Sequence, residues 1–374
     1  MRTLLFLLSL LLSVEAPAQP LPQPPGIAAR AWLLIDYGSN QTLAGANAEQ
    51  RIEPASLTKL MTAYLVFAAL KQGKLKPDQR VPVSERAWRA QGSRMFIEPN
   101  KPVTVAELLR GMIVESGNDA CIALAEAISG SEAAFVATMN HEAQRLGLKN
   151  THFANSTGLP DPQHYSTAAD LARLTSALIR DFPEYYPLYA LKDYSYNHIT
   201  QANRNRLLWL DPHVDGVKTG HTETAGYCLV ASAKRGTRRL ISVVLGADSD
   251  GGRADESQQL LNFGFQYYDA VRLYGAGQVI SRLRVYKGAE STVSAGFLGD
   301  FTLSVPKGRA GQIEVQLSSL QPLLAPVEKG SRIGTLKLTL DGRPYGEYPV
   351  VALETVPVAG ILGRTWDTVR LWFE

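Results

Sequence analysis

Hydrophobic residues recur at two different spacings along this chain. Up to about residue 273, several segments place apolar side chains three and four positions apart, as amphipathic helices do. We expect such helices at 57–73, 104–109, 120–128, 132–146, 166–179 and 256–268. Alternating or continuously apolar runs predict strands at 31–36 and 41–46, and a hairpin formed by 226–233 and 240–247. Together these elements predict an α+β domain in which helices pack against a mainly antiparallel sheet.

The pattern changes near Gly275-Ala276-Gly277, which is typical of a linker. Short segments with alternating apolar side chains follow it, as in 313–317 and 336–340. This alternation predicts a small all-β sandwich or barrel over 274–356. Residues 357–374 return to helical spacing and are rich in tryptophan, which predicts a C-terminal amphipathic helix.

The N-terminal residues 1–18 are typical of a secretory signal peptide. Arg2 precedes the apolar run 4–14, and Ala16-Pro17-Ala18 supplies small residues for cleavage. The run is shorter than the roughly 20 residues that a membrane span needs. We therefore expect cleavage after Ala18 rather than a retained anchor, which would leave 19–273 as the α+β domain of an exported protein.

Composition and charge exclude several classes of function. The 374 residues carry a net charge of +3 with no block of like charges, so nothing indicates a nucleic-acid partner. The six histidines are scattered and no Cys/His pair has metal-ligand spacing, so we expect neither a metal nor another cofactor. Cys121 and Cys228 form no disulfide framework. We expect two free thiols, although an oxidising compartment would allow a bond between them.

The candidate chemistry centres on residues 53–61, an extended entry that turns into a helix. Ser56 and Lys59 stand three apart, so a helix places both side chains on one face. Free backbone N–H groups and the positive helix end suit a nucleophile whose attack creates an oxyanion, with the lysine amine as base. About one Ser-x-x-Lys is expected by chance in a chain this long. Taken alone, the motif therefore indicates no more than an N-cap serine and a solvated lysine.

Two further motifs make the pattern specific. Ser116-Gly117-Asn118 precedes a predicted helix, and Lys218-Thr219-Gly220 precedes the strand at 226–233. With these motifs in this order, the chain resembles the serine D-alanyl-D-alanine carboxypeptidases, the low-molecular-mass penicillin-binding proteins. The similarity extends over the whole mature chain and is carried by Glu53–Lys59, Glu115–Ala120, Asp215–Thr222, Ala225-Gly226-Tyr227, the stretch around Arg253, the β domain and the C-terminal helix. It implies a penicillin-binding-protein or serine β-lactamase-like α+β domain followed by a small all-β domain.

Residue types suggest how these motifs would act. Ser56 Oγ would attack the carbonyl of the penultimate D-alanine, and water would hydrolyse the acyl-enzyme. Lys59 is the candidate base, which requires burial and the nearby Lys218 cation to lower its pKa from about 10.4. Ser116 would relay a proton to the departing amine. Asn118 would bind the substrate amide and hold Lys59.

The third motif is expected to bind substrate. Lys218 would add positive potential, and Thr219 would bind the terminal carboxylate beside Gly220. The resemblance implies an oxyanion hole made by the N–H groups of Ser56 and His221, with the His221 imidazole outside the chemistry. The substrate of a carboxypeptidase has a free terminal carboxylate, and an arginine guanidinium can bind it with two parallel hydrogen bonds. The two candidates for this guanidinium are Arg204, which the resemblance favours, and Arg253.

The resemblance implies further partners and a location. The protein would act on peptidoglycan stem peptides that end in D-Ala-D-Ala, would be acylated by β-lactam antibiotics, and would serve cell-wall maturation and cell shape. It would work in the periplasm, with 357–374 holding it on the outer face of the cytoplasmic membrane. The alternative is that this terminal helix docks on its own β domain.

Two other functions compete with this interpretation. A serine β-lactamase shares the three motifs but needs a carboxylate to activate the deacylating water, and residues 152–156 contain none. A catalytically idle scaffold could bind peptidoglycan through the β domain. The intact Ser56, Lys59, Ser116 and Lys218 argue against it.

Overall fold

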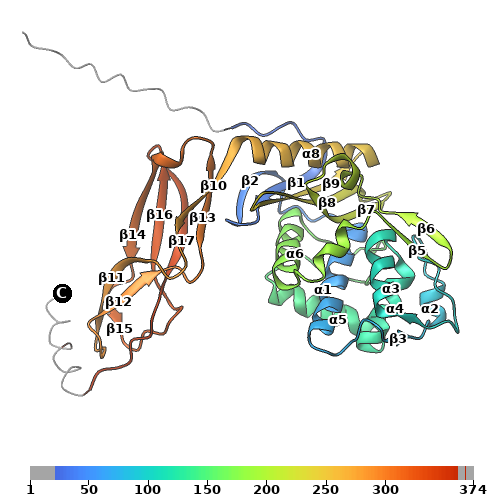
Figure 1. Ribbon diagram of the computed structural model, residues 1–374, viewed down its shortest axis with the longest axis horizontal. Helices are drawn as coiled ribbons and strands as arrows, with labels where there is room; N and C mark the ends of the chain where they lie inside the picture. Colours follow the sequence, from blue (N-terminus) through green and yellow to red (C-terminus); the bar gives the residue numbers. More distant parts are fainter. Residues whose placement is uncertain (1–21, 361–366, 368–374) are drawn as a thin grey trace, which may run out of the picture. The chain divides into compact units, whose positions relative to one another are not determined.

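The computed structural model describes residues 22–360 and Asp367. The chain divides into two compact units (Figure 1). We call Pro24–Gly275 with Asp300–Lys307 the α+β unit, and 276–299 with 308–360 the β unit. The predicted signal peptide at 1–18 lies outside the described residues, as does all of the predicted C-terminal helix except 357–360 and Asp367.

A five-stranded antiparallel sheet forms the centre of the α+β unit. Its order is β2-β1-β9-β8-β7, with β1 Ala29–Asp36, β2 Gln41–Ala46, β7 Val214–Thr222, β8 Gly226–Arg235 and β9 Arg238–Ala247. Successive side chains of β1 enter two different cores. Leu33 and Ile35 join the core shared with the larger group of helices, whereas Trp32 and Leu34 join the core shared with the long helix α8. The sheet is therefore buried on both faces, which explains its nearly continuous apolar strands.

Helices cover both faces of this sheet. In Figure 1, α8 runs along one face, and most of the other helices gather on the opposite side. The helices are α1 Lys59–Lys71, α2 Glu85–Trp88, α3 Val105–Arg110, α4 Asn118–Ser129, α5 Glu132–Arg145, α6 Ala168–Asp181, α7 Leu207–Leu210 and α8 Asp250–Tyr267. Two small ladders add β3 Arg80–Val81 with β4 Val103–Thr104, and β5 Asp193–Tyr196 with β6 Ile199–Ala202. The predicted α+β class is confirmed.

Two elements near the third motif differ from the sequence prediction. Helix α8 begins at Asp250, six residues before the predicted 256, because the Ser249 hydroxyl caps it by accepting a hydrogen bond from Gly252 N–H at 2.9 Å. The Lys218 motif does not merely precede a strand but lies within the edge strand β7. Glycines in β7 obscured its apolar pattern in the sequence.

The β unit contains a six-stranded sheet of order β14-β16-β17-β12-β11-β15. Its strands are β11 Val279–Tyr286, β12 Thr292–Gly296, β14 Ile313–Ser319, β15 Leu323–Leu324, β16 Arg332–Leu340 and β17 Arg343–Ala352. The alternation at 336–340 buries Leu336, Leu338 and Leu340, so the predicted all-β domain is confirmed. One strand departs from a simple division of the chain. β13, Phe301–Pro306, pairs with β10, Tyr268–Tyr274, inside the α+β unit.

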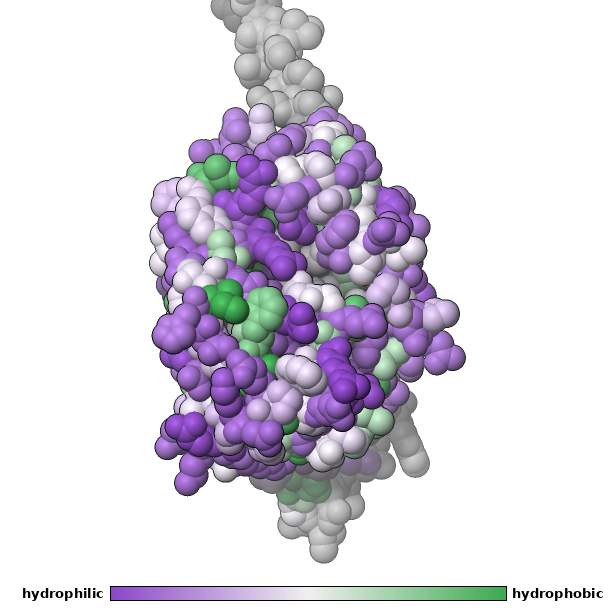
Figure 2. All heavy atoms as spheres, turned by 90° about the vertical axis from the view of Figure 1, so that its right-hand side faces the viewer, coloured by the Kyte–Doolittle hydropathy of each residue, from purple (hydrophilic) through white to green (hydrophobic). Residues whose placement is uncertain are grey.

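Within the described part of the chain, no single helix is long and apolar enough to cross a membrane, and only the bent pair α4 and α5 meets the length and composition criteria together. Figure 2 shows one face of the α+β unit, where hydrophilic side chains predominate and hydrophobic ones form small groups.

The two-sided sheet predicts a strong dependence of stability on Leu34. Its side chain is fully buried, and α8 approaches it so closely that a Cβ on Gly264 would lie 3.0 Å from Leu34 Cδ2. Leu34→Ala should lower the free energy of unfolding of the α+β unit by about 2–5 kcal/mol. Leu210→Ala is the control, because Leu210 is 62% exposed and should change it by about 0.5 kcal/mol or less. Equal losses in urea titrations of the two variants would contradict this packing.

Candidate active site

Ser56 lies in a tight turn that leads into α1. A short 3₁₀ turn, Ala55–Thr58, precedes the first helical residue, Lys59. Ala55 has a φ of +47°, a left-handed conformation that residues with a side chain seldom adopt. The turn and the helix bring Ser56 Oγ and Lys59 Nζ to 3.0 Å.

The amine of Lys59 is buried among oxygen atoms. The residue is 1% exposed, and Nζ lies 2.7 Å from both Asn118 Oδ1 and the Thr157 carbonyl oxygen, in addition to Ser56. A neutral amine has two N–H groups and one lone pair. The two oxygens can accept the two N–H groups, which leaves the lone pair directed at the Ser56 hydroxyl. Thr157 contributes its backbone, so its side-chain type gave no sequence signal for this role.

The surroundings of Lys59 favour the neutral amine. Burial lowers its pKa to about 8, mainly because water no longer solvates the charge. The Arg204 cation acts in the same direction, whereas Cys121 and Asp119 oppose it. No carboxylate forms an ion pair with Lys59 anywhere in the described residues. The fall in pKa that the sequence required therefore comes first from burial.

Ser116 and Lys218 form a second hydroxyl–amine pair. Lys218 Nζ lies 3.0 Å from Ser116 Oγ and 3.1 Å from the Thr219 carbonyl oxygen. Ser116 follows a π-helical turn, Gly111–Glu115, and has a φ of +62°. Burial and the charge of Lys59 hold the pKa of Lys218 well below its usual range. Ser56 thus follows a residue with left-handed backbone, and Ser116 itself has left-handed backbone. The hydroxyl of each serine contacts a buried lysine amine.

The first turn of α4 positions one wall of the cleft. Asn118 donates from Nδ2 to the Gln91 carbonyl at 2.6 Å and from its backbone N–H to the Ser93 carbonyl at 2.7 Å. Asp119 accepts hydrogen bonds from three successive backbone N–H groups at 95–97. Sequence analysis assigned Asp119 no role, although a carboxylate in the first turn of a helix is a recognisable signal.

Strand β7 forms the opposite wall and requires glycine at position 220. A Cβ on Gly220 would lie 2.9 Å from the Pro54 carbonyl oxygen and 3.2 Å from Ser56 N. Glycine therefore allows the strand to run against the serine turn. The His221 ring packs against Tyr227 with their centroids 4.0 Å apart and their planes tilted by 31°. That the imidazole takes no part in the chemistry stays a prediction.

The two candidate arginines occupy different environments. Arg253, in α8, is 4% exposed, pairs with Asp250 and donates to the Gly220 carbonyl at 3.0 Å. Arg204 is exposed, on a loop that Asn203 holds through a hydrogen bond from Nδ2 to the Leu191 carbonyl at 2.9 Å. Among the described residues, no hydrogen bond or ion pair is assigned to Arg204. Its guanidinium is therefore available to a ligand, whereas that of Arg253 supports β7.

These elements enclose a cavity of about 500 Å³. Its lining includes eight residues of the three motifs and their neighbours: Ser56, Ser116, Arg204, Thr219, Gly220, His221, Asp250 and Arg253. The amine of Lys59 contacts Ser56, and the amine of Lys218 contacts Ser116. Asn118 accepts a hydrogen bond from Lys59. The structure brings together all ten residues that the sequence nominated.

The loop at 152–158 bears on the β-lactamase alternative. Glu132 of α5 reaches this loop, but its Oε1 accepts from Ser156 N at 3.0 Å and from Ser156 Oγ at 2.7 Å, while Oε2 pairs with Arg86. The carboxylate is thus used to hold the loop. Asp250, which lines the cavity, pairs with Arg253. Neither carboxylate is placed as a base for a deacylating water. Elsewhere in the core, Cys121 and Cys228 are both buried free thiols.

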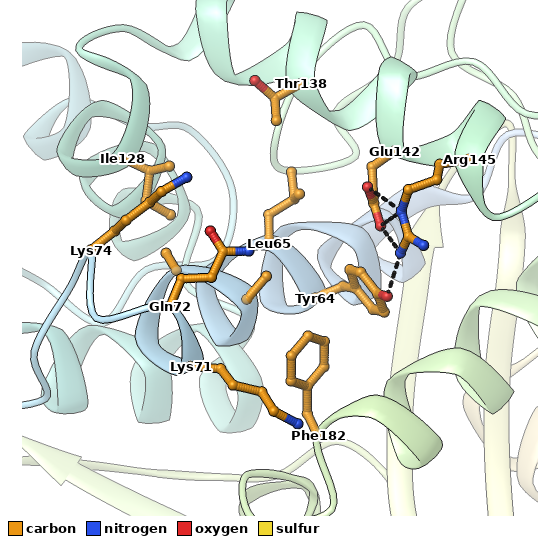
Figure 3. A pocket seen from close by; sticks show the side chains of 12 residues that line it. Tyr64, Leu65, Lys71, Gln72, Lys74, Ile128, Thr138, Glu142, Arg145 and Phe182 are labelled. Carbon is orange, nitrogen blue, oxygen red and sulfur yellow. Dashed lines mark hydrogen bonds and ion pairs between the residues drawn. The ribbon is translucent and has the colours of Figure 1, made fainter.

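A second cavity, of about 370 Å³, lies toward the other end of α1 (Figure 3). It is lined by Tyr64, Leu65, Lys71, Lys74, Ile128, Thr138 and Phe182 among others, and Arg145 on its rim binds Glu142 and Tyr64 Oη. None of the three motifs contributes to this lining. The cavity at Ser56 is therefore the candidate active site.

Comparison with known proteins agrees with this geometry. Residues 18–249 match the peptidase S11 family, described as D-alanyl-D-alanine carboxypeptidase, and residues 268–358 match the C-terminal domain of penicillin-binding protein 5. D-alanyl-D-alanine carboxypeptidase DacC of Escherichia coli K12 is 43% identical over 95% of this chain and 91% of its own length. Penicillin-binding protein 5 from Haemophilus influenzae has a crystal structure that matches with a TM-score of 0.85 and 44% identity, covering 90% of this chain and 99% of that one.

A shorter relative, penicillin-binding protein D2 from Listeria monocytogenes, has been crystallised in an ampicillin-bound form. It matches with a TM-score of 0.60 and 31% identity, covering 65% of this chain and 100% of that one. The chain belongs to the D-alanyl-D-alanine carboxypeptidase family, peptidase S11. The family predicted from the three motifs is confirmed.

Proposed function

We propose that this protein is a serine carboxypeptidase that removes the terminal D-alanine from peptidoglycan stem pentapeptides through an acyl-enzyme on Ser56. Penicillins would acylate the same serine. The observation that carries the proposal is the buried Lys59 amine, 3.0 Å from Ser56 Oγ and with a pKa near 8. Family membership and the ampicillin-bound form of the Listeria relative support both substrate classes.

The chemistry follows from the positions of the two hydroxyl–amine pairs. Lys59 accepts the Ser56 proton as Oγ attacks the carbonyl of the penultimate D-alanine, and backbone N–H groups of Ser56 and His221 stabilise the oxyanion. Ser116, supported by Lys218, passes a proton to the departing amine as the C–N bond breaks. That proton is the one that Lys59 took from Ser56, relayed by Ser116, so Lys59 is neutral again when water attacks the ester carbonyl. Lys59 then takes the proton of the water and returns it to Ser56 Oγ as the ester C–O bond breaks.

The substrate carboxylate would bind beside Thr219 and Arg204. Both residues line the cavity, and Arg204 offers a planar pair of donors that matches a carboxylate. The arriving negative charge would raise the pKa of the nearby Lys218 and so favour its charged form. Carboxylate binding and the positive potential required of Lys218 would then reinforce each other.

Replacement of the nucleophile tests the proposal as a whole. Ser56→Ala should abolish both D-alanine release and covalent capture of fluorescent penicillin, because no other hydroxyl takes its place beside Lys59. Circular dichroism should show an unchanged fold. Turnover near the wild-type level would assign the nucleophile to another residue.

Lys59 as base predicts a specific dependence on pH. The neutral amine is the active form, so acylation should rise with pH through an apparent pKa of about 8, not 10.5. Lys59→Arg keeps the charge but cannot deprotonate, and should slow penicillin acylation by at least about 100-fold. Stopped-flow acylation across the pH range would measure both effects. Rapid acylation by the arginine variant would exclude Lys59 as the base.

The two arginines should behave differently on replacement. Arg204→Ala should lower kcat/KM for D-alanine release by about 10- to 100-fold, as expected for a lost charged hydrogen bond, and more than it slows penicillin acylation. Arg173→Ala is the matched control, since Arg173 in α6 is exposed and lies outside the lining of this cavity. Arg253→Ala should slow both reactions together because Arg253 supports β7. Unchanged peptide turnover by Arg204→Ala would remove this residue from carboxylate binding.

We also propose that the protein works in the periplasm, held on the outer face of the cytoplasmic membrane by its C-terminal residues. The signal-like residues 1–18 support export. On a helix, Leu362, Trp366, Val369 and Phe373 would form one apolar stripe, suited to the membrane interface. Each large apolar side chain could contribute about 1.5–3 kcal/mol when buried, against roughly 1 kcal/mol or more for ordering each residue. Binding should therefore be modest and reversible, and would place the enzyme near the cell wall whose maturation and shape it serves.

Truncation separates this anchor from catalysis. Deleting 358–374 should abolish sedimentation with liposomes while leaving D-alanine release from a small soluble peptide unchanged. The full-length protein provides the comparison in both assays. Persistent sedimentation of the truncated protein, or no binding by the full-length one, would contradict the anchor.

A further inference from the structure

His164 is a buried histidine that uses both of its ring nitrogens. The residue is 2% exposed, and Nδ1 accepts a hydrogen bond from Ala154 N–H at 3.3 Å. A backbone N–H can only donate, so the ring proton must lie on Nε2. Nε2–H then donates to Thr58 Oγ1, 2.8 Å away. None of the three motifs includes His164.

The surroundings of the ring keep it uncharged. Burial lowers the pKa of His164 to about 4, with His152 and Lys59 acting in the same direction and Asp161 opposing them. Protonation would convert Nδ1 from an acceptor into a donor that faces Ala154 N–H. The neutral tautomer is therefore the form that fits both hydrogen bonds throughout the pH range in which Lys59 titrates.

Both partners of His164 belong to the surroundings of Lys59. Thr58 directly precedes Lys59 in the serine turn. The segment 154–158 passes so close to this turn that a Cβ on Gly158 would lie 2.9 Å from Thr58 Oγ1. The same segment carries the Thr157 carbonyl that accepts a hydrogen bond from Lys59 Nζ at 2.7 Å. His164 thus connects the two pieces of chain between which the amine is enclosed.

We propose that His164 is a positioning residue for the base. It ties segment 154–158 to the serine turn, and so keeps the Thr157 carbonyl in contact with Lys59 and water away from the amine. Without this tie, Lys59 would lose an acceptor and regain solvation, which would favour its charged, inactive form. The inference rests on the proposed role of Lys59 as base.

Other groups also act on Lys59 and must stay constant in a test. Cys121 and Asp119 face it from α4, and Arg204 and Lys218 face it from the opposite side of the cleft. Substitutions at His164 leave all of these side chains in place. A change in the apparent pKa of acylation in such variants would therefore report on the enclosure of the amine.

The experiment measures penicillin acylation by His164 variants of the full-length protein as a function of pH. His164→Leu removes both hydrogen bonds, and should slow acylation at neutral pH by about 10- to 100-fold and move the midpoint of the rising limb upward. His164→Gln retains a donor toward Thr58 and should restore part of both losses. His152→Leu is the matched control, because this neighbouring histidine contacts the Gln163 carbonyl instead of Thr58 and should leave the midpoint unchanged.

Each outcome decides the proposal. A folded His164→Leu variant with the wild-type rate and midpoint would overturn it. If that variant fails to fold, Thr58→Val removes the same hydrogen bond from the other side, and an unchanged midpoint there would overturn it equally. If the wild type shows no rising limb near its expected midpoint, the base role of Lys59 fails instead, which distinguishes the two proposals.

Discussion

Enclosing the Lys59 amine among neutral oxygens is the constraint on which the rest of the site depends. Ser56, Asn118 and Thr157 come from three separate segments of the chain, yet all three approach one nitrogen within 3.0 Å. The pKa falls because burial removes solvation while the neighbouring oxygens supply no compensating negative charge. A carboxylate in any of these positions would keep the amine protonated. Lys59 can therefore act as a base because its three hydrogen-bond partners, an amide, a carbonyl and a hydroxyl, are all uncharged.

The same arrangement makes folding less favourable. A pKa shift from 10.5 to about 8 corresponds to about 3 kcal/mol against folding at neutral pH. This penalty is complete below pH 8 and is relieved as pH rises toward 10.5, since the unfolded chain then holds more protons than the folded one. Left-handed backbone at Ala55 and Ser116 adds further strain. The sheet, buried on both faces between helices, offsets these costs and holds the strained turns in place.

Much of this organisation could be predicted from the sequence. Helical and alternating spacings identified the fold class, the six longer helices and four of the five strands in the central sheet. The spacing of Ser56 and Lys59 anticipated their contact. The nominated residues converge on one cavity. Residue types alone could not separate Arg204 from Arg253, because the difference lies in burial and in the backbone carbonyl at Gly220 that Arg253 binds.

Roles that depend on the backbone or on distant packing were beyond prediction. Thr157 acts through its carbonyl, which every residue possesses, and the left-handed turn at Ser116 follows from tertiary packing. His164 is far from Thr58 in the sequence, and a lone buried histidine has no pattern that assigns it a partner. The early start of α8 was missed because paired glycines ordinarily oppose a helix, whereas the Ser249 cap allows one here.

The central claim is that the pKa of Lys59 lies far below that of a solvated lysine, so that the neutral amine is accessible near physiological pH. Direct titration of its side chain tests this claim. Nuclear magnetic resonance of protein labelled at the lysine ε-carbon, with the Lys59 signal assigned by its loss in Lys59→Arg, would follow its protonation. The account predicts a midpoint of about 8. A midpoint near 10.5, the value of a solvated lysine, would contradict it.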